Sequence, residues 1–161
     1  MLVEIKKSDK YSSNGLFAIR DIKKGEIILD WSTGGKEIIS TSHYSDGMNN
    51  ETKDAVQVGT NTWILHPVAR YINHSCNPNA CIGENGMSYV AIKDTQNSKE
   101  CLYDYSMSED SDWKSDFVCI CGEKNCRKEI TSFGKLLEDL QNYFILNKYC
   151  SKYILQNARQ G

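Results

Sequence analysis

The sequence predicts a mainly β domain that carries an α-helical tail at its C-terminal end. Short apolar stretches separated by turn residues fill the first two thirds of the chain, which is typical of small β-sheets. Apolar residues recur at three- and four-residue spacing only near the end of the chain. The 161 residues contain two prolines and no repeat or low-complexity linker, which gives little support to a hinge between two domains.

The expected strands are rich in β-branched and aromatic residues, which favour extended backbone. They are Leu16–Ile19, Glu26–Trp31, Val56–Val58, Thr62–Leu65 and Met87–Ile92. Gly59-Thr60-Asn61 joins the third and fourth strands and predicts a β-hairpin. The polar segment from Ser40 to Asp54 is a surface loop or a short helix, and both remain open.

The C-terminal end has the periodicity of an amphipathic helix, which we expect from about Phe133 to about Leu146. Its apolar positions are Phe133, Leu136, Leu137, Leu140, Tyr143 and Phe144. A second short helix is suggested by Tyr149, Tyr153 and Ile154. We expect this tail to pack its apolar stripe on the body of the domain, with a partner-binding role as the alternative.

Charge and hydropathy argue against several classes of protein. The net charge of −2 and the pI of about 5.9 speak against a surface that follows phosphates, so we expect no direct nucleic-acid binding. No apolar run approaches the length of a membrane span, and the first residues lack a signal-peptide core. We therefore expect an intracellular protein in a reducing compartment, with nucleus and cytoplasm both open and no membrane partner.

The cysteines divide into four candidate metal ligands and three core residues. The chain has seven cysteines, an odd number, and its sequence lacks a signal peptide. Both observations disfavour a disulfide framework. Three thiols lie within eight residues around Gly122, and a more distant one lies in a polar turn; these four are Cys119, Cys121, Cys126 and Cys76. Four thiolates close the coordination shell of zinc, so the expected ion is single and structural, the alternative being unconnected reduced thiols. Apolar neighbours surround Cys81, Cys101 and Cys150.

Four motifs follow one another along the chain. Asn14-Gly15-Leu16-Phe17-Ala18 lies near the start, and Asn73-His74-Ser75-Cys76-Asn77-Pro78-Asn79 follows. Next come Glu100-Cys101-Leu102-Tyr103-Asp104-Tyr105 and a C-x-C-G-x4-C-R module that ends at Arg127. In content and order, from about Leu2 to Ile130, these motifs resemble those of SET-domain protein-lysine methyltransferases with a post-SET zinc module.

The resemblance implies the SET fold, in which short curved sheets surround a pseudoknot that threads the tyrosine-bearing segment beneath a loop. It implies a SET domain at residues 1–115, a post-SET zinc module at 116–130 and a helical tail at 131–161. It implies S-adenosylmethionine as cofactor, held by Asn14, Gly15, Leu16, Arg70, Asn73 and His74. Tyr105 matches the catalytic tyrosine, and Cys76 joins the three post-SET cysteines on zinc.

The chemistry of methyl transfer gives further expectations. The lysine amine must be neutral and in line with the methyl–sulfur bond. A phenol at Tyr105 orients the amine, whereas a carboxylate would hold the lysine charged. By the resemblance, Tyr103 occupies a position where tyrosine restricts the product to the monomethyl state. We expect the substrate channel to be lined by Trp31, Trp113 and Phe117.

The sequence departs from the family pattern at four places. Ser13 replaces the first glycine of G-x-G, Cys101 replaces a leucine, the aromatic-x-Gly after the second strand is stretched at Trp31, and Lys128 follows Arg127 where a glycine is common. None of these changes removes a group that the chemistry needs. The expected function is therefore S-adenosylmethionine-dependent lysine methylation of a histone or another protein with a lysine in a basic segment. The alternative is an inactive SET-like module that binds a peptide or a partner.

Overall fold

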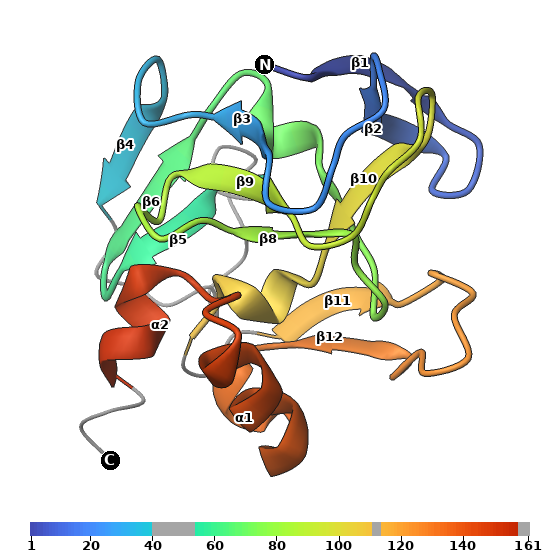
Figure 1. Ribbon diagram of the computed structural model, residues 1–161. Coiled ribbons are helices and arrows are strands. Elements are labelled where there is room, and N and C mark those ends of the chain that lie inside the picture. The colour runs from blue at the N-terminus through green and yellow to red at the C-terminus, as the bar shows by residue number, and fades with distance from the viewer. Residues whose placement is uncertain (40–53, 111–113, 158–161) are drawn as a thin grey trace.

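The described residues form four small sheets, short 3₁₀ helices and two C-terminal α-helices, which confirms the expected mainly β architecture (Figure 1). The computed structural model describes residues 1–39, 54–110 and 114–157, and only the backbone of 114–117. The segment predicted as a loop or helix, Ser40 to Asp54, lies outside the described residues except for Asp54.

The first sheet brings together segments that are far apart in the sequence. Its order is β1 (Val3–Ser8), β2 (Ser13–Ala18), β10 (Glu100–Tyr103) and β7 (Asn73–His74). Strand β10 pairs antiparallel with β2 and parallel with β7. Its insertion places the segment that leads to Tyr105 directly beside Asn73 and His74, as the expected pseudoknot requires.

Two further sheets confirm the other strand predictions. Strand β9 (Ser88–Ala91) lies between β3 (Ile27–Asp30) and β8 (Ala80–Ile82). Strand β6 (Thr62–Leu65) lies between β4 (Lys36–Ile39) and β5 (Val56–Gly59), and the expected hairpin joins β5 to β6. The remaining pair, β11 (Lys114–Val118) and β12 (Glu129–Thr131), flanks the cysteine-rich turn. Figure 1 shows this pair below the first sheet.

The C-terminal helix begins later than the sequence predicts. Phe133–Lys135 forms a 3₁₀ helix, Leu136 and Leu137 are extended, and α1 spans Glu138–Leu146. Gly134 weakens an α-helix at this point, and Glu138 with Asp139 favours a helix start next to it. The predicted start at Phe133 was therefore wrong, while the second short helix is present as α2 (Lys152–Asn157).

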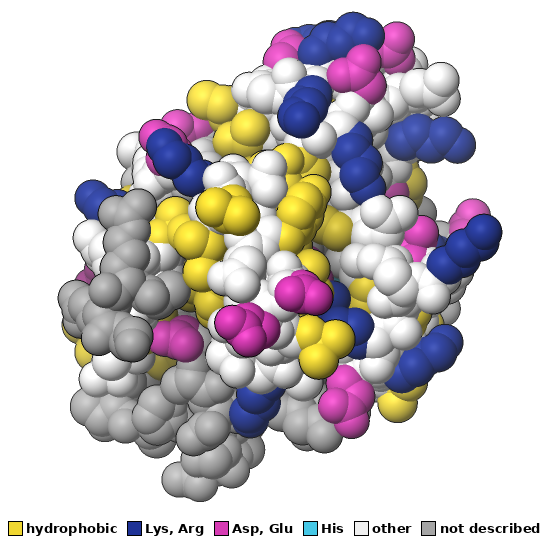
Figure 2. All heavy atoms as spheres, turned by 60° about the horizontal axis from the view of Figure 1, so that its bottom comes forward, with side chains coloured by type: hydrophobic (Ala, Val, Ile, Leu, Met, Phe, Trp, Pro, Cys, Tyr) yellow, Lys and Arg dark blue, Asp and Glu magenta, His cyan; other side chains and the backbone are white. Residues whose placement is uncertain are grey.

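The tail packs on the body of the domain, as expected. Phe144 and Ile154 are 2% and 1% exposed and belong to the main apolar core. Figure 2 turns this end of the molecule forward and shows apolar side chains among charged ones. Two leucines of the tail, Leu137 and Leu146, are exposed. Among the described helices, none has the length and apolar character needed to cross a membrane.

Candidate active site and metal centre

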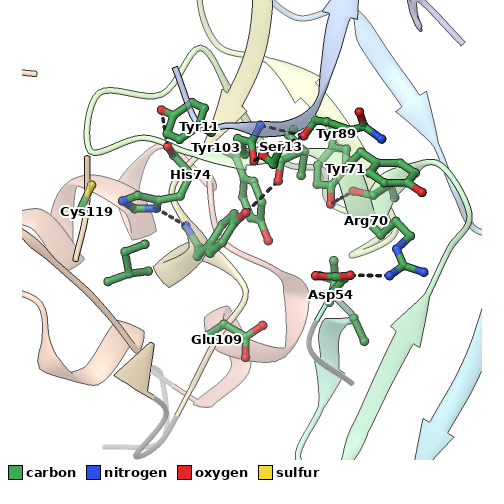
Figure 3. Close-up of a pocket in the computed structure, with 18 of the residues that line it drawn as sticks. Tyr11, Ser13, Asp54, Arg70, Tyr71, His74, Tyr89, Tyr103, Glu109 and Cys119 are labelled. Atoms are coloured by element: carbon green, nitrogen blue, oxygen red, sulfur yellow. Dashed lines mark hydrogen bonds and ion pairs between the residues drawn. The ribbon is translucent and has the colours of Figure 1, made fainter. Parts of the chain in front are cut away.

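A pocket of about 520 Å³ lies where the first sheet meets the 3₁₀ helices and the cysteine-rich turn. This volume falls within the range of sites for small-molecule cofactors. Tyrosine, asparagine and histidine side chains from distant segments line it, and Figure 3 shows how they converge. Of the predicted site residues, the lining includes Asn14, Arg70, Asn73, His74, Tyr103, Tyr105 and Cys119.

Glu100 organises the end of the pocket that holds Asn14 and Asn73. It accepts hydrogen bonds from Ser8 Oγ at 2.8 Å and from Asn73 Nδ2 at 2.7 Å. Asn73 Nδ2 also donates to the Asn14 carbonyl oxygen at 3.0 Å. At Gly15, an added Cβ would lie 2.2 Å from Glu100 Oε1, so only glycine permits this close approach. Neither Gly15 nor Leu16 lines the pocket, and the side chain of Leu16 is fully buried in the core.

His74 is fixed on both sides of its ring. Its Nδ1 accepts a hydrogen bond from the Tyr105 backbone N–H at 3.2 Å, and its Nε2 lies 3.4 Å from Cys76 Sγ. Burial lowers the pKa of His74 to about 4, so the imidazole is neutral at pH 7. The carbonyl oxygen of His74 accepts a hydrogen bond from Tyr11 at 2.7 Å. Tyr11 lines the pocket and was not predicted, since no motif includes it.

Tyr105 lies in a 3₁₀ helix (Tyr105–Met107) and not on the strand that ends at Tyr103. Its hydroxyl donates to the Ile72 carbonyl oxygen at 2.9 Å. Its ring centroid lies 5.2 Å from that of His74 and 5.1 Å from that of Tyr103. Burial raises the pKa of Tyr105 well above 10, so the side chain remains a neutral phenol. This geometry places an acceptor oxygen, and no fixed charge, at the centre of the pocket.

Tyr103 and Tyr89 form the wall next to Tyr105. The Tyr103 hydroxyl lies 3.2 Å from Ser108 Oγ, and the Tyr89 hydroxyl donates to the Ala69 carbonyl oxygen at 3.3 Å. Of the residues predicted to line a substrate channel, Trp31 is 1% exposed and packs behind this wall, with its ring centroid 5.7 Å from that of Tyr89. It is therefore a supporting core residue and does not line the described pocket.

The two other predicted channel residues are described only in part. Trp113 lies outside the described residues, and Phe117 is placed by its backbone in β11.

Two carboxyl groups that sequence reasoning missed lie on the other side of the pocket. Asp54 pairs with Arg70, whose guanidinium lies 5.6 Å from the centroid of the Tyr71 ring. Glu109 lies four residues after Tyr105, is 6% exposed and lines the same pocket. Figure 3 draws both carboxyls on the side of the pocket away from Tyr11. Neither belongs to a motif, so only the folded chain reveals them.

The four predicted cysteine ligands come together. The sulfur atoms of Cys76, Cys119, Cys121 and Cys126 all lie within 4.8 Å of one another. Cys76 Sγ and Cys119 Sγ are 3.8 Å apart, and bonds of about 2.3 Å to a tetrahedral zinc ion put sulfurs about 3.8 Å apart. All four are free thiols. The donor set and its spacing fit zinc.

The pKa of Cys121 shows that the cluster favours a thiolate. Burial raises this pKa, but backbone hydrogen bonds at Cys76 and Glu123, together with the Cys119 and Cys126 thiols, outweigh burial and lower it to about 7. A thiolate is the form that binds metal.

A buried ion pair connects the cysteine-rich turn to the tyrosine segment. Arg127 directly follows Cys126, and its guanidinium donates to both oxygens of Asp104 at 2.7 and 2.8 Å. Asp104 is fully buried and also accepts a hydrogen bond from the Ser106 N–H at the start of the 3₁₀ helix that contains Tyr105. Through this ion pair, the folding of the cysteine-rich turn helps to fix the position of Tyr105.

Comparison with known sequences supports the expected family. A profile described as "SET domain" matches residues 13–106, more than half of the chain. Histone-lysine N-methyltransferase trr of Drosophila melanogaster is 33% identical over 136 residues, 74% of this chain and 5% of that protein. The H3 lysine-4 specific histone-lysine N-methyltransferase of Schizosaccharomyces pombe is 28% identical over 130 residues, 70% of this chain and 13% of that protein. The chain thus spans a small part of these relatives.

Solved structures agree at the level of the fold. KRYPTONITE, in complex with mCHH DNA, an H3(1–15) peptide and SAH, matches with a TM-score of 0.55 at 22% identity, over 80% of this chain and 29% of that chain. The methyltransferase domain of human SETMAR matches with a TM-score of 0.54 at 20% identity, over 81% of this chain and 58% of that chain. At these identities the likeness concerns the fold alone, and the expected SET fold is confirmed.

Proposed function

This chain belongs to the SET-domain family, and on that premise we propose that it is a protein-lysine N-methyltransferase that uses S-adenosylmethionine. Curated relatives that match most of this chain are histone-lysine N-methyltransferases. The observation that carries the proposal is the neutral phenol of Tyr105 at the centre of a pocket bordered by Asn73 and His74. A catalytically inactive module would have no need to keep this arrangement.

The residues at the Asn14–Asn73 end of the pocket suit the proposed cofactor. This end combines backbone polar groups with side-chain amides that Glu100 holds in place through Asn73, which suits a ligand with an amino acid part and a nucleoside. When bound, the cofactor supplies a methyl group on a positively charged sulfur. Asn14, Gly15, Asn73 and His74 would bind and orient it, with Leu16 supporting their backbone from the core and Arg70 beside them.

Tyr105 would position the reacting amine. Its hydroxyl hydrogen is directed to the Ile72 carbonyl oxygen, so the phenol oxygen keeps lone pairs for contacts in the pocket. Those lone pairs can accept hydrogen bonds from an amine and weak C–H···O contacts from a methyl group. The aromatic surroundings disfavour the charged ammonium by desolvation, which promotes the neutral amine that attacks.

The proposed substrate is a lysine in a basic protein segment, such as a histone tail. This extends to the present chain what the names of its relatives state of them, including specificity for H3 lysine-4. A net charge of −2 favours a basic protein over a nucleic acid as the direct partner. The hydroxyl of Tyr103, which narrows the pocket beside Tyr105, supports a mainly monomethylated product.

Zinc is proposed to hold the cysteine-rich turn against the pocket. Cys76 follows the Asn73–His74 strand, while the other three ligands lie between β11 and β12, so one ion would join the two parts. Four thiolates leave no open coordination position, which makes the role structural. Elemental analysis of the purified protein should give one zinc per chain, and Cys126→Ser should lower this ratio.

Methyl transfer from labelled S-adenosylmethionine to core histones and to a ribosomal-protein extract tests the proposed function. Tyr105→Phe should reduce transfer by at least about 100-fold, because the phenol oxygen at the reacting centre is lost. Tyr143→Phe removes the hydroxyl of a 51% exposed tyrosine and should leave transfer unchanged. A wild-type protein that fails to bind S-adenosylhomocysteine would overturn the proposal and favour the peptide-binding module.

A further inference from the structure

Glu109 is a carboxylic acid held in a fixed place in the wall of the pocket. Its backbone N–H donates to the Tyr105 carbonyl oxygen at 3.1 Å, and its own carbonyl oxygen accepts from the Phe133 N–H at 2.8 Å. The next residue, Asp110, donates its N–H to Gln57 Oε1 at 3.0 Å. These bonds fix the backbone on both sides of Glu109, and its side chain lines the pocket, as Figure 3 shows.

One oxygen of this carboxyl has an unmet hydrogen-bonding requirement. Glu109 Oε2 is buried and has no hydrogen bond of normal geometry to the residues that the structure describes, although the Trp63 side chain is close enough to lower the pKa of this carboxyl. The second acidic group of the pocket differs, because Asp54 is paired with Arg70. A buried carboxyl oxygen without a donor is costly to a folded protein. Among the described residues, Oε2 is therefore the carboxyl oxygen of the pocket that can still accept a hydrogen bond from a bound molecule.

The aromatic side chains around Glu109 indicate which class of hydrogen-bond donor would bind there. Tyr89, Tyr103 and Tyr105 line the same pocket as Glu109, and the charge of Glu109 contributes to the raised pKa values of all three phenols. Their ring centroids are 5.3 Å apart for Tyr89 and Tyr103, and 5.1 Å for Tyr103 and Tyr105. Burial in the pocket disfavours a charged ammonium, but aromatic faces and a carboxylate attract cations and offset part of this cost until the proton is transferred. Together they suit the ammonium group of a lysine side chain.

We propose that Glu109 binds the ε-ammonium of the substrate lysine and accepts its proton before methyl transfer, which rests on the proposed methyltransferase function. The proton moves from lysine Nζ to Glu109 Oε2, and the electron pair of the N–H bond stays on nitrogen. That pair forms the bond to the methyl carbon, while the methyl–sulfur bond breaks and leaves its electrons on sulfur. Glu109 releases its proton to solvent after the product leaves.

The acidity of Glu109 agrees with this role. Burial raises its pKa to about 8, against the opposing effects of the Gln57 backbone and the Trp63 side chain. An ordinary carboxylate would keep the lysine charged, because its pKa lies about 6 units below that of lysine. The raised pKa narrows this gap and favours proton transfer at about pH 8 and above, where Glu109 is ionised and the lysine is still an ammonium. Other titratable or charged groups that line the pocket around Glu109 are Asp54, Arg70, Tyr89, Tyr103 and Tyr105.

The first experiment measures amine binding without cofactor. NMR titration with n-butylammonium, a lysine side chain without its backbone, should show at least about tenfold weaker binding to Glu109→Gln than to wild type. Glu84→Gln is the control, because it removes a carboxylate whose side chain is 76% exposed and outside the pocket. Equal affinities of wild type and Glu109→Gln would overturn the proposal.

The second experiment follows kcat/KM for methylation of recombinant histone H3 from pH 6 to 9.5. Wild type and Glu84→Gln should show an inflection near pH 8, which Glu109→Gln should lack while losing about 100-fold in kcat/KM at that pH. An unchanged profile in Glu109→Gln would contradict the proton transfer. A purely structural role would change stability but not remove the inflection.

The two experiments separate the possible failures. If wild type binds n-butylammonium through Glu109 yet methylates no histone, the amine site stands and the proposed function fails. If Glu109→Gln does not fold by circular dichroism, Glu109→Asp takes its place. That variant keeps the carboxyl but withdraws it by one methylene, so weaker n-butylammonium binding is expected and unchanged binding would refute the assignment.

Discussion

At the scale of single residues, the tyrosine hydroxyl groups of the pocket differ in their hydrogen-bond partners. The Tyr105 hydroxyl points its hydrogen at the Ile72 carbonyl oxygen, whereas the Tyr103 hydroxyl pairs with Ser108 Oγ. Both rings lie in one cluster, with centroids 5.1 Å apart. The two phenols can therefore take separate roles, one oriented toward the reacting amine and one limiting the space beside it.

Tyr103→Phe should increase the dimethyl and trimethyl fractions of the product several-fold. Removing the hydroxyl vacates the space next to Tyr105 that a further methyl group needs. Mass spectrometry of methylated histone peptides, taken at equal turnover, measures the distribution. Tyr89→Phe is a suitable control, since that hydroxyl is directed to the Ala69 carbonyl oxygen. A product distribution that Tyr103→Phe leaves unchanged would discard the monomethylation proposal.

Gly15→Ala should weaken cofactor binding by more than about tenfold. Its Cβ would lie 2.2 Å from Glu100 Oε1, so the Glu100 side chain must move and lose its bond to Asn73. Overpacking of this kind costs about 1–3 kcal/mol. Gly134→Ala is the matched control, because its added Cβ meets nothing within 4 Å. Calorimetric titration with S-adenosylhomocysteine should distinguish the two variants, and equal affinities would contradict the assigned role of Glu100.

At the scale of elements, sequence patterns predicted those features that residues close together in the sequence determine. The β5–β6 hairpin follows from its turn residues, and the cysteine cluster follows from ligand spacing. The start of α1 could not be predicted in this way, because the Phe133 N–H bonds to the distant Glu109 carbonyl oxygen and holds its segment out of the helix. Glu109 itself carries no sequence signal, since its role depends on the pocket that distant segments form around it.

Arg127→Gln should destabilise the protein by about 3–5 kcal/mol. The substitution leaves the fully buried Asp104 carboxylate without its cation, and the loss of one partner from a buried pair has this magnitude. Arg20→Gln breaks an exposed pair with Glu26 that water screens, so it should change the free energy of unfolding far less. Denaturant unfolding of zinc-loaded protein measures both values. Similar small losses for the two variants would show that Asp104 does not depend on Arg127.

At the scale of the whole molecule, the pocket lowers the stability of the folded state because it buries the Glu109 carboxyl group. Its walls come from β2, β7 and β10, the 3₁₀ helices and the cysteine-rich turn, and no single element contains the site. The buried Glu109 carboxyl with its free oxygen is an unfavourable feature for folding that the surrounding core must offset. Such a conflict between stability and local chemistry is typical of functional sites.

The stability of the protein should therefore carry a pH dependence that comes from Glu109. Its pKa is about 8 in the folded protein, against 4.5 as an ordinary value. Between these values the folded state keeps a proton that the unfolded state has released, so the free energy of unfolding falls as pH rises. From pH 5 to pH 8 the loss is at most about 4 kcal/mol, at about 1.4 kcal/mol per pH unit.

Urea unfolding of zinc-loaded wild type and Glu109→Gln at pH 5, 6.5 and 8 tests this dependence. The difference between the two proteins cancels the titration of His74 and of the cysteines, which both share, and isolates Glu109. Glu109→Gln should gain stability relative to wild type as pH rises, because the amide has no charge to bury. Parallel curves for the two proteins would mean that the Glu109 carboxyl titrates normally, and its role as a proton acceptor at about pH 8 would lose its physical basis.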